Sequence, residues 1–216
     1  MSDIVFFPGM GADANLAPFH EAIPGKHHWV EWADPAGARS LDEYNRQIRV
    51  RVPAVVDPVF VGISFGGLPA MALAAEYHAQ AVFLIGSLTD AGELAPWLRA
   101  AGVFRHIAPS MLFHPHFMPT TLVAKLFGLK KQDHIHLFAR MAAGYDGDFI
   151  KRLSGFALTE SESSRPPCPV YRVHGRRDKI ISRPRFADLS VDGGHVISMT
   201  HHDEVNDFIT RRLLSS

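Results

Sequence analysis

The sequence predicts an α/β protein: a doubly wound, mostly parallel sheet of six strands that carries a small helical cap insertion. Two observations lead to this prediction. The apolar runs that could form strands lack the alternation of apolar and polar residues, which is typical of strands buried on both faces of a parallel sheet. Helical patterns separate these runs, as the crossovers of a doubly wound sheet require. The length of 216 residues suits one domain, so we expect residues 1–216 to form a single unit.

Six apolar runs account for the expected strands, of which the last has the weakest pattern. In chain order they are residues 4–7, 28–32, 58–63, 81–86, 170–174 and 186–191. One helix is predicted to begin after Ser40 and to end at about Val52, because Ser40 with Glu43 three residues later forms a capping-box pattern. The other helices of the sheet domain are expected at residues 13–23, 65–77 and 204–214.

The insertion is expected between the fourth and fifth strands, at residues 89–167. This stretch carries helical patterns and several prolines but no convincing strand, so we interpret it as a cap rather than an independent domain. Its large apolar residues either line a pocket, which would favour an acyl or aromatic substrate, or pack the cap helices together. They are Trp97, Phe104, Met111, Leu112, Phe113, Phe117, Met118, Leu122, Leu126, Phe127, Leu137, Phe138 and Met141.

The composition argues against several classes of protein. Lys plus Arg and Asp plus Glu balance at 22 each, so there is no net field to attract nucleic acid or an acidic membrane. No apolar window of about 18 residues predicts a spanning helix, and no signal peptide is recognised. Cys168 is the lone cysteine, which excludes an intrachain disulfide and suits a reducing compartment. We therefore expect a cytoplasmic protein that binds neither nucleic acid nor a membrane, with no signal of its oligomeric state.

A G-x-S-x-G motif at residues 62–66 is the strongest chemical signal. It follows an apolar strand and precedes a helix, and a serine at such a sharp turn projects its hydroxyl from the top of the sheet. The turn packs backbone against backbone, so the flanking positions must be small, and Gly62 and Gly66 occupy them. We interpret Ser64 as a nucleophile. The alternative is a glycine-rich turn with an idle serine.

A serine hydroxyl needs a base to become a nucleophile, and the base needs a carboxylate. His195 follows Gly193 and Gly194 after the last expected strand, and Asp178 follows the fifth. Both therefore belong to the edge of the sheet that carries Ser64. The chain order Ser64, Asp178, His195 is typical of this architecture. The alternatives are a turn histidine and a solvated loop aspartate.

Attack by the serine would place negative charge on the carbonyl oxygen of the substrate, and two N–H donors usually stabilise it. Phe65, the residue after the nucleophile, is expected to supply one donor. Met10 is expected to supply the other, from the turn that follows the first strand and contains Gly9 and Gly11. The alternative is that these two glycines only form the turn.

The segments PGMGAD, GISFGG, HGRRD and GGH together resemble the α/β-hydrolase superfamily over nearly the whole chain, in particular its small bacterial serine esterase-like members. The resemblance implies the roles of nucleophile, acid, base and oxyanion donors for Ser64, Asp178, His195, Met10 and Phe65. Two departures are visible. Pro8 stands where many members have histidine, and the segment at residues 178–195 is too short for the usual intervening helix.

The expected reaction is hydrolysis of a carboxylic ester through an acyl-enzyme on Ser64, with a small-molecule ester or acyl substrate and without cofactor or metal. The resemblance also allows a thioesterase, a C–C hydrolase or a lyase that uses the same triad. A ligand-binding protein that keeps the fold without catalysis is the alternative outside enzymes.

Two further features have more than one interpretation. His114 with His116, and His134 with His136, have an H-x-H spacing that can bind zinc, but surface or packing roles are commoner for such residues. A basic run around Asp178 could attract an anionic substrate such as a carboxylate or coenzyme A, or could form a solvated rim. Its members are Arg172, Arg176, Arg177, Lys179, Arg183 and Arg185.

Overall fold

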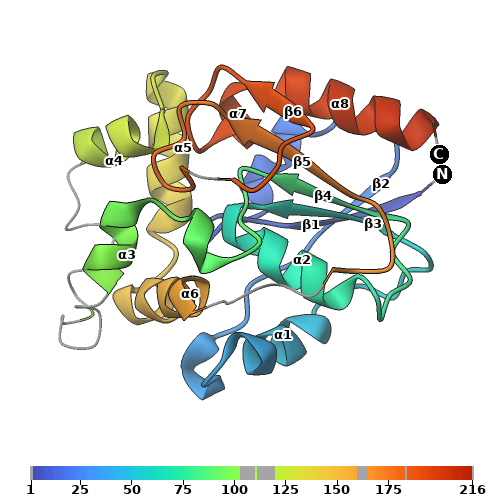
Figure 1. Cartoon of the computed structure of the whole chain (residues 1–216), viewed down its shortest axis with the longest axis horizontal. Helices are drawn as coiled ribbons and strands as arrows, with labels where there is room; N and C mark the ends of the chain where they lie inside the picture. The colour runs from blue at the N-terminus through green and yellow to red at the C-terminus, as the bar shows by residue number, and fades with distance from the viewer. Residues whose placement is uncertain (1, 103–109, 111–119, 160–164, 183, 216) are drawn as a thin grey trace.

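The computed structural model describes residues 2–102, 110, 120–159, 165–182 and 184–215, and a sheet of six strands lies at its centre (Figure 1). The spatial order is β2-β1-β3-β4-β5-β6, and every neighbouring pair is parallel. The predicted doubly wound sheet is therefore confirmed. The strands are β1 (Asp3–Phe7), β2 (Lys26–Trp29), β3 (Val59–Ile63), β4 (Ala81–Ile85), β5 (Val170–Gly175) and β6 (Leu189–Val191).

Helices cover both faces of the sheet. The first layer contains α1 (Leu41–Arg49) and α2 (Gly67–Leu73), and the second contains the 3-10 helix η1 (Ala14–Phe19) and α8 (His202–Leu214) (Figure 1). Side chains of β1 alternate between the layers: Val5 and Phe7 join the α1–α2 core, whereas Ile4 and Phe6 join the α8 core. All four are fully buried. The strand is apolar throughout because each face packs against helices.

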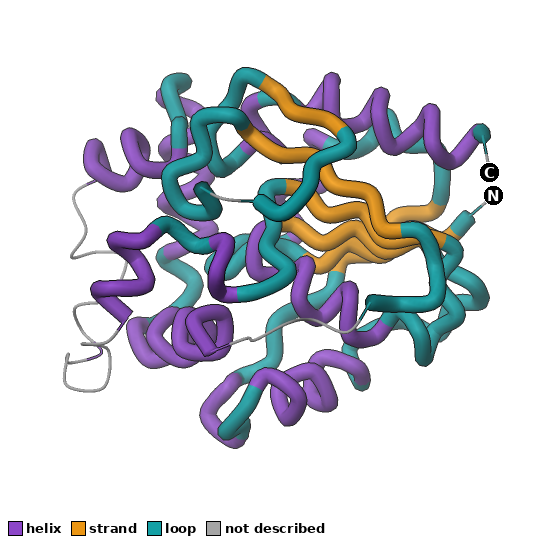
Figure 2. The backbone as a smooth tube through the Cα atoms, in the orientation of Figure 1, coloured by secondary structure: helices purple, strands orange, loops and turns teal. Residues whose placement is uncertain are grey.

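Residues 89–167, here called the insertion, connect β4 to β5 and contribute no strand to the sheet in their described part. The helices of the insertion lie beyond the carboxyl ends of the strands, at the opposite end of the molecule from the two termini (Figures 1 and 2). They are η4 (Ala91–Glu93), α3 (Pro96–Gly102), α4 (Thr120–Phe127), α5 (Gln132–Ala142) and α6 (Gly147–Thr159). Parallel sheets bind ligands at this edge, which is where the sequence places the site.

Two strands differ from the predicted ones. β2 begins two residues earlier than expected and ends at Trp29. Trp32, which was expected in this strand, lies instead in the following loop, where its indole N–H donates to the carbonyl oxygen of Gly9 (3.1 Å). Of the weak strand expected at residues 186–191, only the last three residues pair with the sheet.

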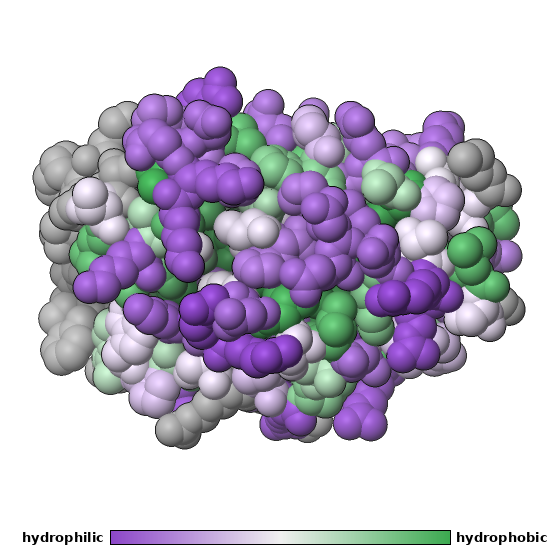
Figure 3. Space-filling model, turned by 90° about the horizontal axis from the view of Figure 1, so that it is seen from above, coloured by the Kyte–Doolittle hydropathy of each residue, from purple (hydrophilic) through white to green (hydrophobic). Residues whose placement is uncertain are grey.

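The helices agree with the prediction to different degrees: α8 begins two residues before the expected start, whereas the helix expected at residues 65–77 is confined to Gly67–Leu73. The N–H of Glu43 donates to Ser40 Oγ (3.2 Å), so α1 begins where the capping box predicts. The helix expected at residues 13–23 is a shorter 3-10 helix that contains Pro18. No helix among the described residues is long and apolar enough to cross a bilayer. Hydrophilic side chains cover much of the face seen from the α8 side (Figure 3).

Candidate active site

Ser64 lies at the sharp turn between β3 and α2. Its φ of +51° is a left-handed conformation that residues other than glycine rarely adopt. Gly62 and Gly66 allow the close packing of this turn. A Cβ at Gly66 would overlap the carbonyl oxygen of Phe7, and a Cβ at Gly62 would lie 2.7 Å from the amide nitrogen of Gly67. The surrounding backbone therefore holds Ser64 in a strained conformation at the carboxyl end of the sheet.

His195 brings its imidazole ring to Ser64. Ser64 Oγ and His195 Nε2 are 2.8 Å apart, which is a hydrogen-bonding distance. His195 lies in the loop after β6 and is only 5% exposed, so bulk water has little access to the ring. The structure thus brings together two predicted site residues that are 131 positions apart in the chain.

Asp178 extends this contact into a continuous chain of hydrogen bonds. Asp178 Oδ2 is 2.8 Å from His195 Nδ1. Asp178 Oδ1 accepts the backbone N–H groups of Ile180 (2.8 Å) and Ile181 (3.0 Å). Because a carboxylate only accepts, Nδ1 carries the imidazole proton and Nε2 faces the serine hydroxyl with its lone pair. The short segment between Asp178 and His195 does not prevent their contact.

The surroundings of Asp178 keep its carboxyl group ionised. Burial alone would raise the pKa of Asp178, but the electrostatic attraction of the His195 imidazole and hydrogen bonds from both histidines and a backbone N–H outweigh burial and hold this pKa well below its ordinary value. The second histidine is His174, whose Nε2 lies 3.3 Å from Asp178 Oδ2 and 2.8 Å from the carbonyl oxygen of Ile181. His174 is not among the predicted site residues, although it begins the HGRRD segment that contains Asp178.

The two residues expected as oxyanion donors are both neighbours of Ser64. Phe65 follows it directly and is buried. Met10 lines the same cavity as Ser64. Gly9, the residue before Met10, lies beside the serine, because a Cβ at this position would be in van der Waals contact with the Cβ of Ser64 at 3.4 Å. The turn after β1 therefore passes directly beside the serine.

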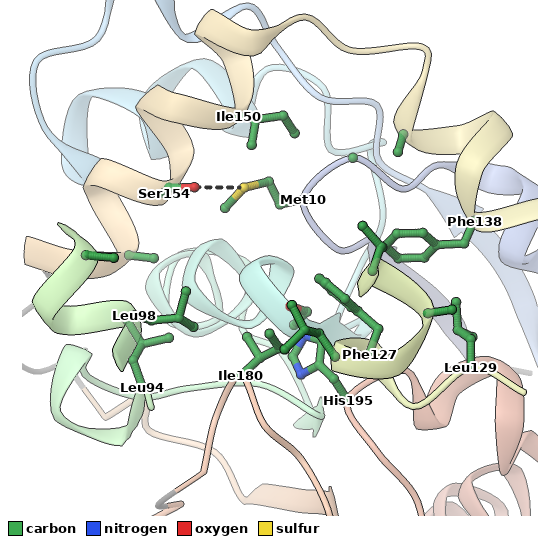
Figure 4. A pocket seen from close by; sticks show the side chains of 18 of the residues that line it. Met10, Leu94, Leu98, Phe127, Leu129, Phe138, Ile150, Ser154, Ile180 and His195 are labelled. Atoms are coloured by element: carbon green, nitrogen blue, oxygen red, sulfur yellow. Dashed lines mark hydrogen bonds between the residues drawn. The ribbon is translucent and has the colours of Figure 1, made fainter. Parts of the chain in front are cut away.

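A cavity of about 670 Å³ lies in front of Ser64 and His195 (Figure 4). Among the described residues of its wall, the polar side chains other than Ser64 and His195 are Ser154 and the indole of Trp97. Ser154 extends from α6 toward Met10, with 3.5 Å between Ser154 Oγ and Met10 Sδ (Figure 4). No aspartate, glutamate, lysine or arginine is found among the described residues that line the cavity. The described part of the wall is therefore largely apolar.

The insertion supplies much of the cavity wall. Four of its residues that were considered as pocket residues line the cavity, namely Trp97, Leu126, Phe127 and Phe138. Two others, Leu137 and Met141, pack against the α8 core instead, and Leu122 is 46% exposed. The remaining six lie outside the described residues: Phe104, Met111, Leu112, Phe113, Phe117 and Met118. Leu94, Ile150 and Ile180 also line the cavity (Figure 4), and they could not be predicted because nothing in the sequence pattern separates them from core residues.

Of the two H-x-H pairs, the structure describes only His134 with His136. Residues 114–116 lie outside the described chain. His134 packs edge-on against the ring of Phe19, with 5.5 Å between the ring centroids. Within the described residues, no group of three or more histidine, cysteine, aspartate or glutamate side chains is arranged to hold a metal ion.

Arg172, the first residue of the basic run, is not part of a solvated rim. It is fully buried in β5, and Glu93 is 1% exposed. Two guanidinium nitrogens of Arg172 each donate to one carboxylate oxygen of Glu93, both at 2.7 Å. This bidentate pair connects the first turn of the insertion to the sheet, so Arg172 has a structural environment that its position in a basic run did not predict.

The other described members of the basic run are directed to the surface. Arg177 pairs with Asp192 (2.9 Å) and Arg185 with Asp90 (2.6 Å), and both arginine side chains are more than half exposed. Arg183 lies outside the described residues. None of the described basic residues lines the cavity. These contacts indicate that the exposed members of the basic run form a solvated rim, and they do not favour a role in attracting an anionic substrate.

No protein-family model matches the sequence, and a search of curated proteins finds no match either. Solved structures do match. An α/β-hydrolase-fold protein from Burkholderia ambifaria is 14% identical with a TM-score of 0.67, over 100% of this chain and 90% of that one. The enol-lactonase from Burkholderia xenovorans is 13% identical with a TM-score of 0.74, over 99% and 91%. An esterase from Exiguobacterium antarcticum is 12% identical with a TM-score of 0.70, over 98% and 91%. The sheet order and these full-length matches together establish that this chain has the α/β-hydrolase fold.

Proposed function

We propose that the protein is a serine hydrolase that cleaves carboxylic esters, with Ser64 as nucleophile, His195 as base and Asp178 as acid. One observation carries the proposal: two hydrogen bonds of 2.8 Å join these three side chains in a line that ends at the cavity. A serine that only completes a turn has no need of a histidine and a carboxylate aligned on its hydroxyl group. The esterase and the enol-lactonase of the same fold support the same type of chemistry.

Acylation begins when Ser64 Oγ attacks the carbonyl carbon of the ester and His195 Nε2 takes the hydroxyl proton. Asp178 keeps Nδ1 protonated and stabilises the imidazolium ion that forms. The backbone N–H groups of Met10 and Phe65 donate to the oxygen that becomes negative, and each such donor typically contributes about 10²–10³ in rate. The imidazolium then gives its proton to the leaving alcohol oxygen as the carbon–oxygen bond breaks.

Deacylation repeats these steps with water. His195 takes a proton from a water molecule as its oxygen attacks the carbonyl carbon of the acyl-enzyme. The same N–H donors stabilise the second tetrahedral intermediate. His195 returns the proton to Ser64 Oγ as the bond to the acyl carbon breaks, which releases a carboxylic acid and restores the free enzyme.

The cavity supports an uncharged, apolar substrate. Its volume of about 670 Å³ falls within the range typical of small-molecule sites. A charged substrate would meet no opposite charge among the described lining residues, and an unpaired buried charge is costly. A coenzyme A thioester is less well supported, because Arg177 and Arg185, which could attract its phosphates, already pair with aspartates.

The test compares Ser64→Ala with a serine control. Wild-type protein is expected to hydrolyse short p-nitrophenyl esters, and Ser64→Ala is expected to lower kcat at least about 10³-fold without loss of the fold. Ser190→Ala, an exposed site on β6, is the matched control and should keep the wild-type rate. Labelling with a fluorophosphonate followed by mass spectrometry should place the adduct on Ser64. A wild-type protein with neither turnover nor adduct would favour the non-catalytic alternative.

A further inference from the structure

The end of α4 makes an unusually close backbone contact with the loop that carries His195. Gly128, the residue after α4, has a φ of +77°, and a Cβ there would lie 2.7 Å from Gly194 Cα. A Cβ at Gly194 would in turn lie 2.9 Å from the carbonyl oxygen of Phe127. Only glycine at both positions allows this approach. The second glycine of the GGH segment therefore has a partner in the insertion, 66 residues earlier by number.

The contact is also a hydrogen-bonded one. The carbonyl oxygen of Phe127 accepts the backbone N–H of His195 (3.1 Å) and that of Val196 (3.3 Å). Helix ends leave carbonyl groups without partners in the helix, and the N–H of Leu129 uses the Ala124 carbonyl at this end (2.8 Å). The Phe127 carbonyl lies at this end of the helix and accepts its hydrogen bonds from the His195 loop.

The side chain of Phe127 reaches the same residue. Its ring lies 5.4 Å from the His195 ring between centroids, at an interplanar angle of 74°, and it also lines the cavity (Figure 4). From the sheet side, Gly86 at the end of β4 packs so closely that a Cβ there would lie 2.7 Å from the carbonyl oxygen of His195. The main chain of His195 is thus contacted by the insertion at its N–H and by the sheet at its C=O.

We propose that the C-terminal turn of α4, through the carbonyl of Phe127 and the close approach at Gly128, is a positioning element for His195. The insertion then does more than line the cavity, because it fixes the base on which turnover depends. This inference rests on the proposed role of His195 as the base. A catalytic base must keep its geometry within a few tenths of an ångström, and small displacements of such groups cost about 10²-fold in rate.

The first experiment uses Gly128→Ala, with Leu122→Ala on the exposed side of the same helix as control. Gly128→Ala should push α4 away from Gly194, so the amides of His195 and Val196 should exchange hydrogen about tenfold faster or more. Its kcat for a p-nitrophenyl ester should fall about tenfold while KM changes less than twofold. Leu122→Ala should leave both readouts at the wild-type values.

Two further variants keep the inference falsifiable. Asn tolerates a positive φ better than Ala, so Gly128→Asn places a Cβ against Gly194 with less risk to folding, and it should reproduce the effect of Gly128→Ala. Phe127→Leu keeps the carbonyl group but changes the ring that lines the cavity, so hydrogen exchange at His195 and Val196, rather than activity, should stay within about threefold of wild type. Unchanged exchange at His195 in both Gly128 variants, or faster exchange with unchanged kcat, overturns the inference.

The exchange measurement also separates this inference from the proposed function. It needs no substrate, so it reports whether α4 holds the His195 loop even in a protein that hydrolyses no ester. A wild-type protein without esterase activity would refute the proposed function alone. An active wild type whose Gly128 variants keep full activity would refute the positioning role alone.

Discussion

Two buried carboxylates near the carboxyl end of the sheet have similar surroundings. Asp178 accepts two backbone N–H groups on one oxygen and faces His195 with the other. Glu93 also accepts two backbone N–H groups, and it faces Arg172 with both oxygens. In each case burial would raise the pKa of the carboxyl group, but the neighbouring basic side chain and the hydrogen bonds hold that pKa below its ordinary value.

The partner of each carboxylate makes the difference. Arg172 keeps its proton under all physiological conditions, so its pair with Glu93 can only stabilise structure. The imidazole of His195 can accept and release a proton, and Ser64 is in position to supply one. A buried carboxylate with satisfied hydrogen bonds is therefore not by itself a catalytic group. Its role depends on whether the side chain that it faces can exchange a proton, as His195 can, and on whether that side chain contacts a proton donor such as Ser64.

Asp178→Asn gives the largest expected effect and tests the catalytic side of the comparison. The amide still accepts the N–H groups of Ile180 and Ile181, but it can donate to His195 Nδ1 and so favours the tautomer whose Nε2 carries a proton. Such a histidine cannot take the proton of Ser64. We expect kcat to fall on the order of 10³–10⁴-fold, with a melting temperature close to that of wild type, measured by ester hydrolysis and thermal unfolding. A variant that keeps a tenth of the activity would contradict the role of Asp178.

Glu93→Gln tests the structural side and should have the opposite profile. The amide cannot neutralise Arg172, which leaves a fully buried guanidinium group without its counter-charge. Removing one partner of such a pair typically lowers the free energy of unfolding by about 3–5 kcal/mol, which urea denaturation measures. The kcat of the folded fraction should stay within about fivefold of wild type. Loss of activity as large as in Asp178→Asn, without loss of stability, would mean that the two carboxylates do not differ as proposed.

The strands of the sheet could be predicted from the sequence, because a buried parallel strand has a local signal, which is a short apolar run. The end of β2 could not be predicted in this way. Trp29 and Trp32 are both apolar and near in sequence, yet only the first belongs to the strand. An apolar residue is expected to be buried, but its apolar character does not show whether it is buried in a strand or in a loop that packs on the sheet. The bond from Trp32 to Gly9 is a tertiary contact with no counterpart in the local pattern.

The same limit applies to the site. Ser64, Asp178 and His195 follow strands at one edge of the sheet, so their proximity could be predicted from local motifs. The partner of Arg172 could not, because Glu93 is 79 residues away and each residue alone reads as a surface charge. The carbonyl oxygen of Phe127 could not be predicted either, since a main-chain acceptor is present in every residue and leaves no trace in the sequence.

His20 is a third buried ionisable group, and its hydrogen-bond partner in the described chain is a neutral amide rather than a counter-charge. It is fully buried beside η1 in the α8 layer. Its Nδ1 donates to Asn206 Oδ1 (2.9 Å), whereas its Nε2 has no hydrogen-bond partner in the described chain. Burial lowers the pKa of His20 to about 4, and the hydrogen bond to Asn206 offsets only part of this effect. His20 is therefore neutral in the folded protein at pH values where an unfolded chain would protonate it.

The pH dependence of stability tests this difference. Between pH 6.5, the ordinary pKa, and about pH 4, the unfolded chain binds a proton at His20 that the folded chain does not. The free energy of unfolding should therefore fall as the pH falls through this window, by up to about 3 kcal/mol. His20→Gln keeps a donor for Asn206 and cannot titrate, so its urea-denaturation curves should lack this loss. Asp178 and Glu93 have lowered pKa values, and their contributions disappear mainly at more acidic pH. If the free energy of unfolding falls equally with pH in wild type and His20→Gln, the prediction is contradicted. Burial of His20 without a counter-charge would then destabilise the fold at acidic pH no more than burial of the paired carboxylates.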